Sequence, residues 1–279
     1  MTFTTLISAA DFAERLPDPA FGIAVVDCRF MLDDVEWGGR EYLKAHIPGA
    51  VYANLDRDLS GAKTGTNGRH PLPSPDALKG TFSTLGIADG VQVVAYDQDN
   101  GMYASRLWWL LRWMGHDAVA VLDGGFAEWT KAKLPTASGE EHRARREFVG
   151  APRDELLVEA DSVANSEWRL VDARAPERYR GEVEPLDTVA GHIPGATNHF
   201  YKHNLDEAGL FLPPGELRGH LAAVVGDVPP AHVVSYCGSG VTGCHNVLAL
   251  EHAGMHGARL YAGSWSEWSS DPARPVAKG

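Results

Sequence analysis

The sequence predicts an α/β protein made of two similar domains in tandem, each with a mostly parallel sheet flanked by helices. Two observations support this fold class. The chain contains an internal repeat, and each copy alternates short β-branched runs with segments of helical pattern. The length of 279 residues also suits two domains of ordinary size.

The repeat consists of four blocks that recur in the same order about 140 residues further along the chain. One block, His-Ile-Pro-Gly-Ala, is identical in its two copies. The paired blocks are 25–29 with 170–174, 46–50 with 192–196, 93–97 with 233–237, and 124–129 with 263–268. We therefore expect domains at 1–132 and 156–279, joined by a charged linker at 133–155 that contains several Pro and Gly residues.

Within each copy, β-branched runs predict buried strands and longer periodic segments predict helices. Ser74 is a candidate N-cap because Pro75 follows at the first helical position. The expected strands are Ile23–Val26, Gln92–Tyr96, Ala118–Leu122 and His232–Tyr236, and the expected helices include Tyr103–His116 and Thr242–Ala253. Ligands of such parallel sheets bind at the carboxyl ends of the strands.

Charge and composition exclude several classes of protein. A net charge of −12 disfavours nucleic acid and anionic membranes as partners, and no apolar run is long enough to span a bilayer. The three cysteines, Cys28, Cys237 and Cys244, form neither a disulfide framework nor a CxxC zinc pair. With no basic, apolar leader at the N-terminus, we expect a cytoplasmic protein. We also expect it to use no metal and no cofactor.

Cys237 stands directly after a predicted strand and before a predicted helix. The connecting loop contains Gly238 and Gly240, which permit backbone conformations that let several N–H groups converge on the sulfur. Such a loop at a helix N-terminus favours an anion, either a thiolate or a persulfide. The alternative for Cys237 is a buried cysteine beside an ordinary turn. Cys28 lies in a strand pattern and Cys244 on the helix after the loop, so we expect both to be core residues or to pack behind the site.

These motifs together resemble the rhodanese family of sulfurtransferases, most closely its tandem-domain members that use 3-mercaptopyruvate. The resemblance covers nearly the whole chain and includes the active loop, Cys237-Gly238-Ser239-Gly240-Val241-Thr242. It implies that a sulfane sulfur passes from 3-mercaptopyruvate, through a Cys237 persulfide, to a thiol, cyanide or thioredoxin-like acceptor, with release of pyruvate. The first domain would be inactive, since Asp97 replaces the cysteine there.

The resemblance also implies roles for residues outside the loop. Arg178 would hold the donor carboxylate, with Arg180 as a second candidate, because a guanidinium binds carboxylates in a bidentate fashion. Ser239 would form a proton relay with His70 and Asp56, both contributed by the inactive copy. The alternative for His70 is an ordinary loop histidine. The repeated residues Arg29, Arg174, His46 and His192 are expected to support the fold.

Three other functions compete with this interpretation. A thiosulfate:cyanide sulfurtransferase is the main alternative, but similar enzymes that prefer the thiosulfate dianion tend to have basic residues in the loop, and the five residues after Cys237 are uncharged. A cysteine phosphatase needs a Cys-x5-Arg loop, and position 243 is Gly. A binding module without catalytic activity would suit the first copy alone.

Overall fold

The computed structural model describes residues 2–16, 22–164 and 168–279, which form two compact units. The first unit comprises Met1–Ser60, Pro73–Pro152 and Glu207–Leu210. The second comprises Gly61–Leu72, Arg153–Asp206 and Phe211–Gly279. No described helix is both long enough and apolar enough to cross a membrane.

The sheet of the first unit has five parallel strands in the order β1-β5-β4-β2-β3. The central strands are fully buried, which explains why they read as continuous apolar runs. In chain order the strands are β1 (Leu6–Ile7), β2 (Ile23–Asp27), β3 (Ala50–Tyr52), β4 (Gln92–Tyr96) and β5 (Val119–Leu122). The expected strands of this copy are thereby confirmed to within one residue at either end.

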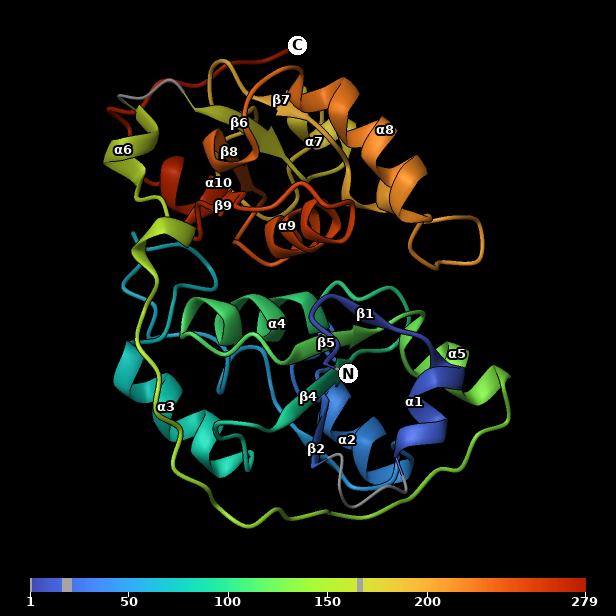
Figure 1. Ribbon diagram of the computed structural model, residues 1–279. Coiled ribbons are helices and arrows are strands. Elements are labelled where there is room, and N and C mark those ends of the chain that lie inside the picture. Colours follow the sequence, from blue (N-terminus) through green and yellow to red (C-terminus); the bar gives the residue numbers. More distant parts are fainter. Residues whose placement is uncertain (1, 17–21, 165–167) are drawn as a thin grey trace. The chain divides into compact units, whose positions relative to one another are not determined.

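Helices cover both faces of this sheet (Figure 1). Side chains of α1, α2 and α5 share an apolar cluster with Val94 and Tyr96, while α4 packs on the opposite face of β4 and β5. Ser74 caps α3 as expected, with its Oγ accepting the backbone N–H of Ala77 at 3.2 Å. The helices are α1 (Ala9–Arg15), α2 (Trp37–Lys44), α3 (Pro75–Thr84), α4 (Ala104–Trp113) and α5 (Gly125–Lys131).

The sheet of the second unit has four parallel strands in the order β7-β6-β8-β9. These are β6 (Arg169–Asp172), β7 (Thr197–Asn198), β8 (Val233–Tyr236) and β9 (Arg259–Leu260). The strand expected from His232 begins one residue later, because Pro230–His232 form a 3-10 turn after Pro229. β8 lies in the interior of the sheet, and its carboxyl end leads directly into the cysteine loop.

The helices of the second unit also divide between two faces of the sheet. Val163 of α6, Tyr179 of α7 and two tryptophans of α10 share an apolar cluster with Val234 and Tyr236, whereas α8 and α9 pack together on the opposite face. The helices are α6 (Ala160–Ala164), α7 (Pro176–Tyr179), α8 (Pro214–Val225), α9 (Thr242–His252) and α10 (Ser264–Trp268). Two further 3-10 turns are Asp154–Leu156 and Tyr201–Asn204.

The repeated Asp-x-Arg blocks have the same structural role in both units. Arg29 donates to the buried carboxylate of Asp27, and Arg174 donates to that of Asp172 in the same geometry. The repeated histidines also match: Nδ1 of His46 lies 2.9 Å from the carbonyl oxygen of Tyr42, and Nδ1 of His192 lies 2.7 Å from that of Tyr179. Each arginine also donates to the carbonyl of the residue before the repeated histidine, Arg29 to Ala45 at 2.6 Å and Arg174 to Gly191 at 2.7 Å, and so ties the strand end to that segment.

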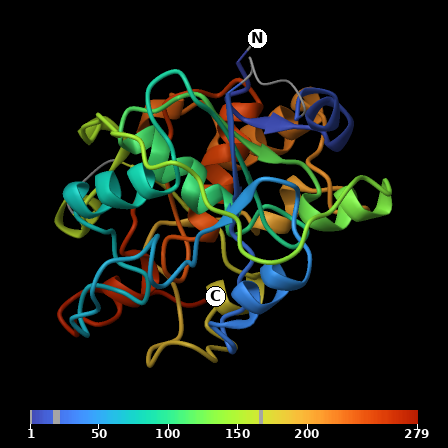
Figure 2. The same ribbon diagram turned by 90° about the horizontal axis from the view of Figure 1, so that it is seen from below.

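The segment 61–72 groups with the second unit, whereas the sequence places it in the first domain. The cause is a set of contacts with the C-terminal part of the chain. The backbone N–H of Arg69 donates to Oγ of Ser266 at 3.1 Å, and the hydroxyl of Ser270 donates to the carbonyl of Thr66 at 3.2 Å. In both ribbon views this segment, in light blue, runs beside the red C-terminal segment (Figures 1 and 2).

Candidate active site

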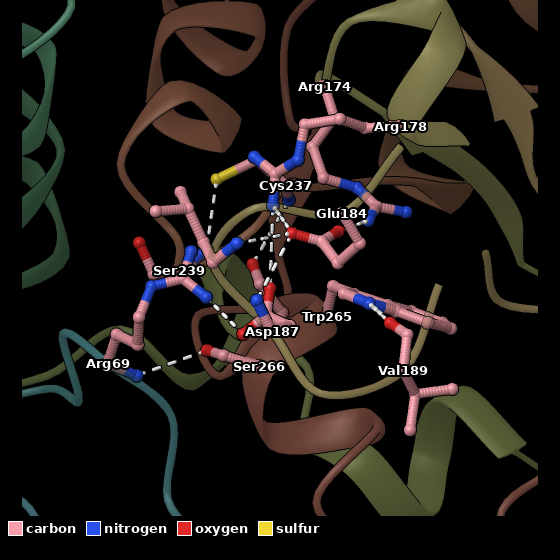
Figure 3. Close-up of polar contacts among 12 residues, drawn as sticks. Arg69, Arg174, Arg178, Glu184, Asp187, Val189, Cys237, Ser239, Trp265 and Ser266 are labelled. Carbon is pink, nitrogen blue, oxygen red and sulfur yellow. Dashed lines mark hydrogen bonds and ion pairs between the residues drawn. The ribbon is translucent and has the colours of Figure 1, made fainter. Parts of the chain in front are cut away.

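The sulfur of Cys237 lies at the carboxyl end of β8, in the turn that leads to α9 (Figure 3). Backbone N–H groups of Ser239 and Gly240 donate to Sγ, with N–S distances of 3.4 and 3.1 Å. Gly240 adopts φ +76°, and a Cβ there would lie 2.2 Å from the carbonyl oxygen of Ala262. Glycine is therefore required where the chain turns its N–H groups toward the sulfur.

The start of α10 fixes the backbone of Cys237. The N–H of Cys237 donates to Oγ of Ser264 at 3.1 Å, and the N–H of Trp265 donates to the carbonyl of Cys237 at 2.9 Å. Ser264 is fully buried and has φ +56°, a left-handed conformation that is unfavourable for a residue with a side chain. Ser264 thus accepts the hydrogen bond from Cys237 while its own backbone is strained.

The other two cysteines are buried, as expected, with 1% of Cys28 and 0% of Cys244 exposed. Burial raises the pKa of the Cys28 thiol well above its usual value, with neighbouring carboxylates adding to the effect, so this thiol stays neutral. The thiol of Cys244, in α9, donates to the carbonyl of Gly240 at 3.1 Å and so helps to fix the cysteine loop.

Ser239 and His70 meet, although 169 residues separate them in the sequence. Oγ of Ser239 lies 2.7 Å from Nδ1 of His70, and only 6% and 4% of these residues are exposed. Both belong to the second unit by their contacts, although His70 lies in the sequence of the first copy. Asp56, the third residue expected in the relay, belongs to the first unit.

Two arginines approach the loop at Gly238. A Cβ at Gly238 would lie 2.7 Å from Nη2 of Arg69 and 3.6 Å from Nη1 and Nη2 of Arg178. Nη2 of Arg178 donates to Glu184 at 2.6 Å and lies 3.4 Å from Asp187, which also accepts from Arg69 (Figure 3). The guanidinium of Arg178 is therefore aimed at the loop and oriented by carboxylates.

Arg180 lies two residues further on and has a different environment. Its Nε and Nη2 donate to the carboxylate of Glu182 at 2.7 and 2.9 Å, and 44% of its side chain is exposed. Of the two candidates for the donor carboxylate, the structure thus brings Arg178 to the cysteine loop and pairs Arg180 with a surface carboxylate.

Asp97 occupies the corresponding position in the first unit, at the end of β4. Its carboxylate accepts the N–H groups of Gly101, Tyr103 and Ala104 at 3.0, 2.7 and 3.1 Å. Burial nevertheless raises the pKa of this carboxyl to about 6, because removing the charge from water outweighs these hydrogen bonds. The first copy therefore retains a ring of N–H donors and fills it with a carboxyl group.

Two residues of the site were missed by the sequence reasoning. Arg69 offered one signal, its place next to His70, but its contact with Asp187 crosses 118 residues. Ser264 aligns with Gly125, whose φ is also +56°, so the repeat itself marks the position as left-handed. Among residues 2–16, 22–164 and 168–279, no group of three or more His, Cys, Asp or Glu is arranged to hold a metal ion.

Fold and site together define a duplicated α/β protein in which the strand-end loop of the second copy directs two backbone N–H groups at a cysteine sulfur. The rhodanese-like domain family matches residues 8–132 and 156–271. The chain therefore belongs to the rhodanese family, as a tandem-domain member.

Its relatives have names that refer to two sulfur donors. The chain is 47% identical to a probable 3-mercaptopyruvate sulfurtransferase of Pseudomonas aeruginosa over the full length of both chains. It is 40% identical to a putative thiosulfate sulfurtransferase of Mycobacterium tuberculosis, covering 98% of this chain and 97% of that one. The solved 3-mercaptopyruvate sulfurtransferase of Leishmania major superposes with a TM-score of 0.85 at 30% identity, covering 95% of this chain and 74% of that one.

Proposed function

We propose that this protein is a sulfurtransferase that takes a sulfane sulfur from 3-mercaptopyruvate onto Cys237 and passes it to an acceptor. The observation that carries the proposal is the hydrogen bonding of Sγ, which accepts backbone N–H groups from Ser239 and Gly240. Donors fixed in this way stabilise a thiolate before reaction and a persulfide anion after it.

The first half-reaction exchanges one bond for another at the donor sulfur. The Cys237 thiolate attacks the sulfur of 3-mercaptopyruvate, an S–S bond forms, and the C–S bond breaks with its electron pair left on carbon. The leaving group is the enolate of pyruvate, which becomes pyruvate when a proton reaches its methylene carbon. A thiolate or cyanide then attacks the outer sulfur and regenerates the Cys237 thiolate.

Ser239 and His70 are the proposed proton carriers for this step. Their 2.7 Å contact permits a proton to pass between the hydroxyl and the imidazole, and Ser239 is itself part of the cysteine loop. We assign Asp56 to the relay as the residue that orients His70, on the strength of the family resemblance. Small thiols, cyanide and thioredoxin-like proteins are the proposed acceptors.

Arg178 is the proposed binding residue for the donor carboxylate. Its guanidinium lies against Gly238, one residue from the nucleophile, and a planar guanidinium can donate two hydrogen bonds to a carboxylate. Arg180 is the second candidate for this role. It is less well supported, because its side chain is paired with Glu182 at the surface. The three cysteines are free thiols, which suits the reducing conditions of the cytoplasm.

The decisive experiment compares donors and locates the sulfur. Steady-state rates with 3-mercaptopyruvate and with thiosulfate, using one acceptor, should show the higher kcat/KM for 3-mercaptopyruvate. Mass spectrometry after incubation with donor should find one added sulfur on the peptide containing Cys237, and Cys237→Ser should abolish transfer without loss of fold. A higher kcat/KM for thiosulfate would establish the alternative donor, and a persulfide on Cys28 or Cys244 would overturn the assignment.

A further inference from the structure

The carboxylate of Asp187 lies between two arginines beside the cysteine loop (Figure 3). One of its oxygens accepts from Nη1 of Arg69, and the other lies 3.4 Å from Nη2 of Arg178. Only 7% of the Asp187 side chain is exposed. A resident carboxylate therefore already engages the two cationic groups that are closest to Gly238.

The position of these cations makes their charge important for any anionic donor. A Cβ at Gly238 would lie 2.7 Å from Nη2 of Arg69, so the guanidinium touches the residue that follows the nucleophile. The side chain of Arg69 is 27% exposed and that of Arg178 is 17% exposed, so water screens their charges only in part. A donor whose sulfur reaches Cys237 must enter the field of this cluster.

The charges of the cluster balance. Three guanidinium groups are paired with three carboxylates: Arg69, Arg174 and Arg178 with Asp172, Glu184 and Asp187. The site consequently offers directed hydrogen-bond donors but little excess positive charge. Donors of different charge respond differently to such a site, because 3-mercaptopyruvate has one carboxylate whereas thiosulfate is a dianion.

We propose that Asp187 is a specificity-determining residue: its carboxylate neutralises the arginine pair beside the cysteine loop and so favours monoanionic sulfur donors over dianionic ones. Repulsion from a fixed carboxylate scales with the charge of the donor, so the second negative charge of thiosulfate is penalised. This inference rests on the proposed function, since it concerns the choice of donor at the same site.

The test compares Asp187→Asn with the wild-type enzyme using both donors. The substitution keeps the size of the side chain and removes its charge, so kcat/KM for thiosulfate relative to that for 3-mercaptopyruvate should rise about tenfold. Asp187→Glu restores the charge and should keep the ratio near the wild-type value. Glu182→Gln is the matched control, because it removes a carboxylate from the same segment, at the exposed partner of Arg180.

A second measurement does not depend on turnover. The rates at which anionic iodoacetate and neutral iodoacetamide alkylate Cys237, followed on its peptide by mass spectrometry, report the local charge directly. Their ratio should also rise about tenfold in Asp187→Asn and stay unchanged in Glu182→Gln. Thermal unfolding of each variant checks that the fold is retained.

The outcomes separate the two proposals. If the wild-type protein transfers sulfur from neither donor but the alkylation ratio rises in Asp187→Asn, the proposed function fails and the charge effect of Asp187 stands. If sulfur transfer occurs and both ratios stay within about twofold of wild type in Asp187→Asn, Asp187 does not determine specificity. Equal changes in Asp187→Asn and Glu182→Gln would likewise overturn the inference, since they would reflect net charge alone.

Discussion

The stability of the first unit should fall as the pH rises from about 4 to 7, because of one buried carboxyl group. Asp97 is 1% exposed, and burial raises its pKa from 3.8 to about 6. Between these two values the folded protein binds a proton that the unfolded chain releases. The free energy of unfolding therefore decreases with rising pH across this interval.

The size of the effect follows from the difference between the two pKa values. A difference of about two units corresponds to about 3 kcal/mol, present in full below pH 4 and lost once the pH exceeds about 6. Asp97→Asn removes this titration. It also leaves a single side-chain oxygen for the N–H groups of Gly101, Tyr103 and Ala104, which shifts stability by an amount that does not vary with pH.

Native-state hydrogen exchange of the backbone amides in β4 is the appropriate assay, since β4 lies inside the sheet of the first unit and leads into Asp97. The exchange free energies of wild type and Asp97→Asn are compared at each pH, so that the contributions of the other titrating groups cancel in the difference. The difference should change by about 3 kcal/mol between pH 4 and pH 7. Asp76→Asn, which removes a carboxylate whose side chain is 94% exposed, is the control.

A difference between wild type and Asp97→Asn that stays constant across this pH range would refute the reasoning. Such a result would mean that the N–H groups around Asp97 stabilise its charge as well as water does. A change of the same size in Asp76→Asn would instead assign the pH dependence to the overall charge of the chain.

Three further predictions concern the candidate site. His70→Ala should lower kcat with 3-mercaptopyruvate more than it weakens binding. An unchanged kcat and pH profile would show that His70 is an ordinary loop histidine with no part in proton transfer. Arg178→Lys should raise KM and Arg178→Ala should lower kcat/KM about tenfold or more, while alkylation of Cys237 by iodoacetamide continues at nearly the wild-type rate. Ser264→Ala should destabilise the protein by about 1–3 kcal/mol in denaturant unfolding, because the N–H of Cys237 loses its acceptor. Ser264→Gly should cost less, because glycine adopts φ +56° without strain, and equal losses in the two variants would contradict this.

Much of the fold was predictable because apolar runs, which indicate strands, and capping residues, which indicate helix starts, are both local features of the sequence. The β4 segment is buried on both faces of the sheet and is therefore a continuous apolar run in the sequence. The start of α3 is marked by Ser74 and Pro75 alone, because the capping serine contacts the backbone only three residues further on. The repeat transfers each assignment from one copy to the other. The position of Cys237 at a strand end followed from the same local pattern.

The cationic side of the site was only half predictable, because it depends on contacts between distant segments. Arg178 follows from the family resemblance, whereas Arg69 reaches the loop through the packing of segment 61–72 against Gly263 and Ser266. A charged loop residue looks the same in the sequence whether it faces solvent or a carboxylate. The contacts of Asp187 were hidden for this reason, since its two arginine partners lie 9 and 118 residues away.

The two copies differ in their loops by more than the exchange of one side chain. In both copies, the backbone carbonyl after the strand accepts an N–H from the short helix that follows the next strand, at 2.8 Å from α5 to Asp97 and at 2.9 Å from α10 to Cys237. The loops then diverge, because α4 begins seven residues after Asp97 and α9 begins five residues after Cys237. The wider loop places its N–H groups around carboxylate oxygens, which extend one bond further from Cβ than a cysteine sulfur does. The tighter loop turns the N–H groups of the second and third residues back onto Sγ. The loop of the first copy is therefore shaped to surround a carboxyl group, whereas the shorter loop of the second copy is shaped to direct N–H groups at a cysteine sulfur.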